Sequence, residues 1–341
     1  GADGGTTVGA SDRLRYLMMP ENFQHETVLL QESIDGIVTD PDGIYVDCTL
    51  GGGGHSAAIL ERLSPQGTLV GFDRDPAALI AATAKLVRFS SQIRLVPGNF
   101  AEIDTLLTRL GIGQVNGVLF DLGVSSHQLD LPQRGFSYMK EGPLDMRMDP
   151  AQPLSALQVV NEYSEDELNR VIFEYGEERW ARRIAKFIVE ARQAKPLQNT
   201  AELVEVITAA IPAAARRQGP HPAKRTFQAI RIEVNGELRI LAGALQSAIE
   251  RLAPGGRIGV ISFHSLEDRI VKNVFAGLLG RCTCPPRVPI CTCNARAVLE
   301  LRGKALAPSD EEVERNPRSR SAKLRIAEKI GQGGQNDAAN P

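Results

Sequence analysis

Short apolar runs that alternate with helix-like stretches dominate the first third of the chain. Five runs predict strands, at Ile44–Asp47, Leu69–Asp73, Ile93–Val96, Gly117–Leu122 and, much later, Arg257–Phe263. Helices are predicted between the early strands, at Ser56–Leu63, Pro76–Val87 and Phe100–Leu110. Strands that alternate with helices are typical of a parallel, doubly wound sheet. The pattern therefore predicts an α/β fold, with a final strand over Ala322–Ala327 and a weaker partner over Val298–Arg302.

The middle of the chain has a different periodicity. From about residue 125 to residue 225 the apolar positions recur at helical spacing, and no strand of comparable quality is found. Ser164 begins a capping box, and the helix that it starts ends at Gly176. The next helix ends at Lys195-Pro196, and Thr200 caps a third. This segment predicts an inserted, all-helical subdomain over residues 131–225.

After the insertion the pattern of the α/β domain resumes. Apolar positions from Phe227 to Leu252 trace one face of a long helix, which we expect to continue through Gly236 and Gly243. Pro254-Gly255-Gly256 then predicts a tight turn into a strand. The predicted α/β domain comprises residues 21–130 and 226–330, and the ends, 1–20 and 331–341, are expected to be disordered.

A glycine loop lies where the first predicted strand meets the first helix. The strand Ile44–Asp47 is followed closely by Gly51-Gly52-Gly53-Gly54, and such a loop lets backbone approach a ligand closely. About twenty residues on, Asp73 ends the second strand, where a carboxylate can accept hydrogen bonds from a ribose diol. The unit therefore predicts a nucleoside-like cofactor.

The loop departs from the dinucleotide fingerprint. Gly51 and Gly53 fit Gly-x-Gly-x-x-Gly, but Ser56 replaces the third glycine. Asp47, at the end of the first strand, suits a cofactor with an amino-acid tail, because its carboxylate can approach an ammonium directly or through water. The cofactor that matches best is S-adenosyl-L-methionine.

Composition and charge narrow the class of protein. The chain has 341 residues and a formal net charge of −2, so nucleic-acid contact would require a local basic patch. No apolar run approaches the roughly 20 residues of a membrane helix, and the N-terminal segment lacks the apolar core of a secretory signal. Few cysteines and no such signal predict a cytoplasmic protein without membrane partners.

Four of the five cysteines cluster as Cys282-x-Cys284 and Cys291-x-Cys293. Zinc ribbons prefer Cys-x2-Cys, so the spacing is poor for a metal. Reduced loop thiols are the simpler interpretation, and a structural zinc site is the alternative. We predict no metal at the active site.

Nine sequence blocks resemble one known family, the MraW/RsmH methyltransferases. In chain order, the blocks begin at His25, Gly53, Phe72, Asp121, Arg134, Gly142, Arg225, Ile261 and Asn316. They include Asp121-Leu122-Gly123-Val124-Ser125-Ser126 and Ile261-Ser262-Phe263-His264-Ser265. These bacterial enzymes methylate the exocyclic N4 amine of a cytidine in small-subunit (16S) ribosomal RNA, near the decoding centre.

The resemblance implies a class I, Rossmann-like methyltransferase domain and a helical insertion that recognises RNA. It implies a cofactor pocket made of Gly53, Gly54, His55, Asp73, Phe100, Asp121 and Gln128. Asp73 would take the ribose hydroxyls and Phe100 would pack on adenine, whereas Gln128 enters from the family alone. The partner would be small-subunit ribosomal RNA or the assembled subunit. A monomer and a homodimer are both compatible with the sequence.

Two carboxylates are candidates for the acceptor of the amine proton. Asp121 is the first and Asp145 is the second. The assignment stays open because this chain has Asp121-Leu122-Gly123-Val124 in place of the Pro-Pro-aromatic motif of other amino-methyltransferases, and Asp121 can also serve the cofactor alone. Three aromatic residues are candidates for stacking a splayed-out base: Phe136, Tyr138 and Phe263.

Simpler roles stay open for several of these residues. His55 fits a helix N-terminus as well as a ligand pocket, His264 fits the core as well as a site, and Trp180 fits the core. Two basic stretches are candidates for phosphate contact, one between Arg216 and Arg225 and one between Arg315 and Arg325. The rival functions are a non-catalytic ribosome-assembly factor that binds RNA and, less well supported, an NAD-dependent dehydrogenase.

Overall fold

The computed structural model describes residues 26–217, 219–280 and 296–331. The predicted disordered segment 1–20, nearly all of 331–341 and the four clustered cysteines lie outside these ranges. The chain forms two compact units, each described by itself below. Within the described ranges no helix is both long enough and apolar enough to cross a bilayer.

The first unit contains the described parts of Gly1–Asp121, Ala248–Ile261 and Leu278–Pro341. Its strands are β1 (Ile44–Asp47), β2 (Thr68–Asp73), β3 (Ile93–Pro97), β4 (Val115–Asp121), β5 (Leu252–Ser262), β6 (Leu299–Leu301) and β7 (Lys323–Lys329). Its helices are α2 (Leu30–Ile37), α3 (Gly54–Arg62), α4 (Pro76–Lys85), α5 (Ile103–Arg109) and α15 (Asp310–Arg315), with short 3-10 turns at Val87–Phe89, Phe100–Glu102 and Pro317–Ser321.

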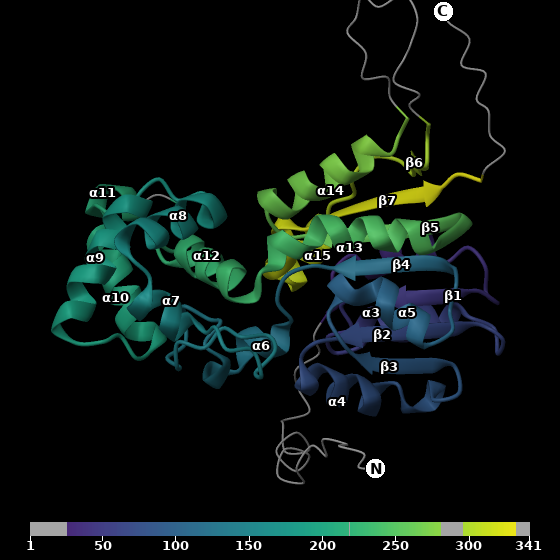
Figure 1. Ribbon diagram of the computed structural model, residues 1–341, viewed down its shortest axis with the longest axis horizontal. Helices are drawn as coiled ribbons and strands as arrows, with labels where there is room; N and C mark the ends of the chain where they lie inside the picture. The colour runs from purple at the N-terminus through teal and green to yellow at the C-terminus, as the bar shows by residue number, and fades with distance from the viewer. Residues whose placement is uncertain (1–25, 218, 281–295, 332–341) are drawn as a thin grey trace, which may run out of the picture. The chain divides into compact units, whose positions relative to one another are not determined.

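The seven strands form one sheet in the order β3-β2-β1-β4-β5-β7-β6 (Figure 1). The pairs β1–β2, β2–β3, β1–β4 and β4–β5 are parallel, and β6–β7 is antiparallel. The direction in which the chain adds strands reverses between β1 and β4, and ligands of such sheets bind at the carboxyl ends beside this switch point. The predicted α/β, doubly wound fold is confirmed.

Helices cover the sheet on both faces because its crossovers run in two directions. Apolar residues of α2, α3 and α4, such as Ile34, Ile59 and Ala82, form one cluster with sheet residues Tyr45 and Leu119. The crossover through α5 runs the opposite way, which places α5 on the other face when crossovers are right-handed. The buried apolar strands explain why these runs read as continuously hydrophobic rather than alternating.

The second unit contains Leu122–Ser247 and Ser262–Gly277 and is helical. Its helices are α6 (Ser126–Asp130), α7 (Ala156–Glu162), α8 (Glu165–Gly176), α9 (Ala181–Ala194), α10 (Thr200–Ala210), α11 (Ala213–Arg216), α12 (Lys224–Asn235) and α14 (Ser265–Gly277), with a 3-10 turn at Pro132–Arg134. Helix α13 (Glu237–Arg251) begins in this unit and ends in the first. Ser164 caps α8 with a full capping box, as predicted.

The limits of this unit differ from the predicted insertion, 131–225, at both ends. Helix α12 packs against α8 and α7, so its apolar face, which includes Phe227 and Ile230, belongs to the same core as the insertion. The helix carries the insertion's core pattern although it follows the expected boundary at Arg225. The chain order alone could not assign α12 to either unit.

Three local predictions were wrong. The long helix after Arg225 breaks at Gly236, which adopts a left-handed φ of 61° and ends α12 before α13 begins. The Pro254-Gly255-Gly256 segment lies inside β5 as an irregularity of its pairing with β4, not as a turn before a strand. Asn199, rather than Thr200, caps α10, because the Asn199 side chain accepts from the backbone of Glu202.

The two glycines of this region should respond oppositely to alanine. Gly236→Ala forces a side chain into left-handed backbone and should lower the free energy of unfolding by about 1–2 kcal/mol. Gly243 lies within α13, and a Cβ there meets nothing within 4 Å, so Gly243→Ala should raise it by about 0.5–1 kcal/mol. Urea denaturation of both variants checks the pair; equal effects would contradict the assigned helix break.

Candidate active site

The glycine loop connects β1 to α3 through left-handed backbone. Gly51 has a φ of 48° and Gly53 a φ of 74°, a region that glycine enters without strain. A Cβ on Gly54 would lie 2.0 Å from the Thr27 hydroxyl oxygen, so the start of α3 also requires a glycine. Conformation and packing therefore explain the glycines at positions 51, 53 and 54.

Asp73, at the end of β2, holds this loop in place. Its Oδ2 accepts a hydrogen bond from the Gly51 backbone N–H at 2.9 Å, and its Oδ1 accepts from the Asp75 N–H at 2.8 Å. Burial raises the pKa of this carboxyl, although the two backbone hydrogen bonds oppose the shift. Each oxygen keeps a further lone pair, so the carboxylate can also accept from the hydroxyl groups of a ligand.

Asp47, at the end of β1, is buried, with 1% of its surface exposed. Its Oδ2 accepts from the Ser56 hydroxyl at 2.7 Å and its Oδ1 accepts from the Thr49 N–H at 3.1 Å. Burial raises the pKa of Asp47 to about 6, and the nearby Asp73 carboxylate adds to the rise. Asp47 thus ties both ends of the loop together, and Ser56 is its partner where the dinucleotide fingerprint has glycine.

The raised pKa of Asp47 predicts a pH-dependent stability of the ligand-free protein. The folded state binds a proton that the unfolded state, with a pKa near 3.8, has lost, so this contribution declines as pH rises through about 6. Between pH 4.5 and 7.5 wild type should lose about 2 kcal/mol relative to Asp47→Asn. Denaturant titrations at several pH values measure this difference, and a difference that is constant with pH would refute the assignment.

Asp121 ends β4, the strand next to β1, and contacts with Thr49 and His55 fix its position. Its backbone N–H donates to the Thr49 hydroxyl at 2.6 Å, which joins the ends of β4 and β1. The Nδ1 atom of His55 lies 3.6 Å from Asp121 Oδ2, and His55 Nε2 lies 3.1 Å from the Val28 carbonyl oxygen. His55 is therefore a buried neighbour of Asp121 rather than a cap of its own helix.

The remaining first-unit candidate, Phe100, opens the 3-10 turn after β3. Its ring packs edge-on against Phe120 of β4, with 5.6 Å between ring centroids. Asp47, Asp73 and Asp121 therefore end β1, β2 and β4, and parallel neighbouring strands finish at one edge of a sheet. Six of the seven predicted cofactor residues therefore belong to the first unit, which contains this edge of the sheet.

The seventh cofactor candidate, Gln128, and the second candidate proton acceptor, Asp145, belong to the second unit. Gln128 forms a capping box at the start of α6, where its Oε1 accepts from the Ser125 N–H at 3.1 Å. Asp145 makes a two-pronged ion pair with Arg147, with N–O distances of 2.8 and 3.0 Å. Burial tends to raise the pKa of Asp145, but the Arg147 hydrogen bonds outweigh it, and the pKa is lowered.

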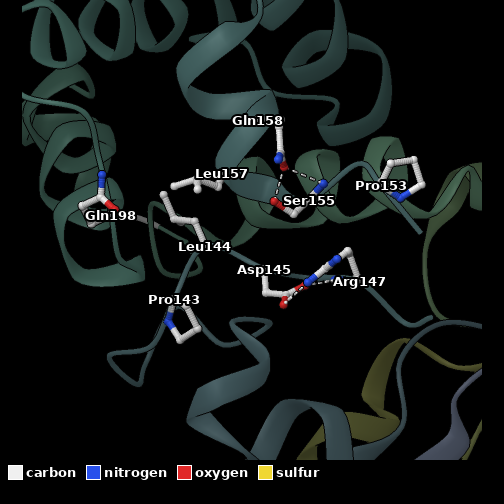
Figure 2. Close-up of a pocket in the computed structure, with 9 residues that line it drawn as sticks. All are labelled: Pro143, Leu144, Asp145, Arg147, Pro153, Ser155, Leu157, Gln158 and Gln198. Carbon is white, nitrogen blue, oxygen red and sulfur yellow. Dashed lines mark hydrogen bonds and ion pairs between the residues drawn. The ribbon is translucent and has the colours of Figure 1, made fainter. Parts of the chain in front are cut away.

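A pocket of about 320 Å³ adjoins this ion pair (Figure 2). It is lined by Pro143, Leu144, Asp145, Arg147, Pro153, Ser155, Leu157, Gln158 and Gln198. Figure 2 shows the Asp145 carboxylate turned to the Arg147 guanidinium and the Gln158 amide hydrogen-bonded to Ser155. Within each pair, the polar groups therefore bind their partner. A low pKa and a satisfied carboxylate make Asp145 a weaker proton acceptor than the sequence suggested.

The aromatic candidates have different environments within the second unit. Phe136 is buried in the helical core, whereas Tyr138 stacks on His221 with 4.7 Å between ring centroids. Phe263 is half-buried in the loop after β5, and the Glu267 carboxylate accepts from its backbone N–H at 2.7 Å. Phe136 is therefore unavailable for stacking on a base, and Tyr138 and Phe263 stay candidates.

Sequence reasoning missed a buried charged network around the Phe263 loop. Arg231 pairs with Glu237 at 2.9 Å, and His264 Nε2 lies 3.1 Å from Glu267. Burial raises the pKa of Glu267, but His264, Arg231 and the backbone hydrogen bond from Phe263 together lower it below its usual value. The available signal was the three-residue spacing from His264 to Glu267, which is that of a helix-capping pair.

Among the described residues no group of three histidine, cysteine or acidic side chains is arranged to hold a metal. The four clustered cysteines, the alternative zinc site of the sequence analysis, lie outside the described residues.

The fold and the loop are typical of α/β enzymes that bind a nucleoside cofactor at a switch point. In this chain an acidic side chain ends each of the strands β1, β2 and β4 beside the loop. The chain belongs to the MraW methylase family, whose model matches residues 22–330. It is therefore a methyltransferase that uses S-adenosylmethionine, and both the family and the cofactor predicted from the sequence are confirmed.

Curated relatives match almost their full length. "Ribosomal RNA small subunit methyltransferase H" of Heliobacterium mobile is 56% identical over 310 residues, which cover 90% of this chain and 99% of the relative. The protein of the same name from Clostridioides difficile strain 630 is 54% identical over 309 residues, with 90% and 99% covered. A solved rRNA methylase from Streptococcus thermophilus overlays with a TM-score of 0.41 and 13% identity, covering 90% of this chain and 99% of that one.

Proposed function

We propose that the chain transfers a methyl group from S-adenosylmethionine to the exocyclic N4 amine of a cytidine in small-subunit ribosomal RNA, near the decoding centre. The names of the relatives support small-subunit ribosomal RNA as the substrate. The family resemblance of the sequence blocks supports the cytosine amine as the methyl acceptor. The single structural observation behind the proposal is the position of Asp121. It ends the strand beside the glycine loop and is fixed by Thr49 and His55.

The residues of the first unit fit the cofactor. The left-handed glycines leave backbone free of side chains, and Asp73 retains acceptor capacity beyond the hydrogen bonds from Gly51 and Asp75. In this proposal the loop carries the methionine portion, Asp73 the ribose, and Phe100 the adenine. When bound, the cofactor supplies an electrophilic methyl group on a sulfonium, so the chain needs only to position and activate the acceptor.

Asp121 then improves a poor nucleophile. The amine lone pair of cytosine is delocalised into the ring, and a carboxylate that accepts from its N–H groups favours a tetrahedral nitrogen. The same carboxylate takes the surplus proton as the new N–C bond forms. Asp121 suits this task better than Asp145, whose oxygens accept three hydrogen bonds from Arg147.

The proposal is tested with purified chain, labelled S-adenosylmethionine and small ribosomal subunits from cells that lack the modification. The expected product after digestion is N4-methylcytidine, identified by mass spectrometry, with large subunits as the unmethylated control. Label on another nucleoside would overturn the assigned acceptor. Tight S-adenosylhomocysteine binding with no label on any ribosomal RNA would favour the assembly-factor hypothesis.

A further inference from the structure

A basic face lies on the second unit, where α11 leads into α12. It consists of Arg216, Arg217, His221, Lys224 and Arg225. The four arginine and lysine residues are exposed, and residues 213–225 contain no acidic side chain. In a chain of net charge −2, this is a local concentration of positive charge that the composition as a whole does not show.

The cations of the basic face are not used to hold the fold together. No carboxylate of residues 26–217, 219–280 or 296–331 forms an ion pair with Arg216, Arg217 or Lys224. Arg225 donates to the Glu177 carbonyl oxygen at 3.0 Å, so its side chain is anchored at one nitrogen and has further donors. Other arginines of this unit, such as Arg147, Arg170 and Arg231, do pair with carboxylates.

The start of α12 adds to the same charge. Its first two residues are Lys224 and Arg225, its first turn has no acid, and Ala223 provides no side-chain cap. The N-terminus of a helix carries partial positive charge and normally favours acidic residues. Helices α8 and α15 of this chain follow that preference, with three acids each in the first turn. At α12 the two cations and the uncapped helix N-terminus therefore add to the positive potential of the basic face.

An aromatic pair lies beside these cations. The rings of Tyr138 and His221 are 4.7 Å apart between centroids and nearly parallel, at 21°, and Phe227 packs edge-on against Tyr138 at 5.9 Å. The His221 Nδ1 accepts from the Ala223 N–H at 3.2 Å, which fixes the ring on the backbone. Both rings are half-buried, so each also has accessible surface.

We propose that the basic face binds the phosphates of an unpaired segment of the RNA substrate, with the His221–Tyr138 pair as a stacking platform for one base. Cations follow the backbone and aromatic rings stack on bases in proteins that bind single-stranded nucleic acid. The inference rests on the proposed function for the identity of the RNA. It assigns the contact to α11 and α12, which are separate in sequence from every predicted cofactor residue.

The test is a double charge reversal, Arg216→Glu with Arg217→Glu. Its matched control is Lys85→Glu with Arg109→Glu, which changes the net charge equally at exposed positions of α4 and α5. Affinity for unmodified small ribosomal subunits is measured at several KCl concentrations, without methyl transfer. The test variant should bind at least tenfold more weakly. The plot of log affinity against log salt has a negative slope, and the slope should become shallower by about 1.4, as two lost phosphate contacts require.

A second variant, His221→Ala, separates stacking from charge. It should weaken binding severalfold while the salt slope stays unchanged, because the four arginine and lysine side chains of the basic face are all kept. S-adenosylhomocysteine affinity should equal wild type in all three variants, which shows that the first unit is intact. The proposal is overturned if the double reversal binds subunits as its control does. If the variants show the expected affinities for subunits but the wild-type chain forms no N4-methylcytidine, only the proposed function is refuted.

Discussion

Asp73→Ala is expected to weaken S-adenosylhomocysteine binding at least about 100-fold. The carboxylate has two tasks: it accepts from Gly51 and Asp75, and in the proposed site it accepts from the ribose hydroxyls. Hydrogen bonds to a charged group contribute about 1.5–3 kcal/mol each, and two such losses correspond to at least that factor. Isothermal titration of the ligand-free variant measures the change.

A surface carboxylate of the same unit provides the control. Asp35 is about half exposed and pairs with Arg62 on the surface, so Asp35→Ala should leave the affinity within twofold of wild type. Asp73→Asn keeps one acceptor oxygen and should bind more tightly than Asp73→Ala. An Asp73→Ala variant that binds S-adenosylhomocysteine normally would remove β2 from the cofactor site.

Asp121→Asn is expected to lower the rate of methyl transfer in a single turnover by about 100- to 10,000-fold, the usual contribution of a positioned acid or base. The amide is nearly isosteric with the carboxylate but has little basicity, so it cannot take the surplus proton. Its backbone hydrogen bond to Thr49 is unaffected by the change. The rate is measured at saturating S-adenosylmethionine and saturating subunits.

Two comparisons keep this prediction specific. If Asp121 served only the cofactor, Asp121→Asn would raise the dissociation constant of S-adenosylhomocysteine and leave the rate at saturating substrates unchanged. Asp145→Asn should lower the rate less than about tenfold, because the pKa of Asp145 is already held low by Arg147 and the residue is poorly suited to accept a proton. The reverse order of the two variants would reassign the acceptor to Asp145.

The sequence predicted the strands of the sheet well because buried parallel strands appear as short apolar runs that end in acids. The first two strands end at Asp47 and Asp73, as predicted, and the fourth ends at Asp121, one residue before the predicted Leu122. The helix break at Gly236 could not be predicted, since a glycine within an apolar helical pattern is compatible with a continuous helix or with a left-handed cap.

The candidate site was predictable where chemistry is local and not where it depends on tertiary contacts. The glycine loop and Asp73 lie in one strand–loop–helix unit, so spacing alone identified them. The neighbourhood of His55 and Asp121, 66 residues apart in the chain, arises only when β4 pairs with β1. The Asp145–Arg147 ion pair is local in sequence, but its two-pronged geometry is visible only in the folded loop.

The central claim is that methyl transfer occurs to one particular nitrogen, and it is tested by isotopic labelling of both reactants. The chain is incubated with S-adenosylmethionine carrying a ¹³C methyl group and with small subunits whose RNA is labelled with ¹⁵N. The product nucleoside is isolated and its one-bond ¹³C–¹⁵N coupling is measured by nuclear magnetic resonance. The account predicts a coupling to N4 of cytidine. A methyl group coupled to a ring nitrogen, or coupled to no nitrogen at all, would contradict it.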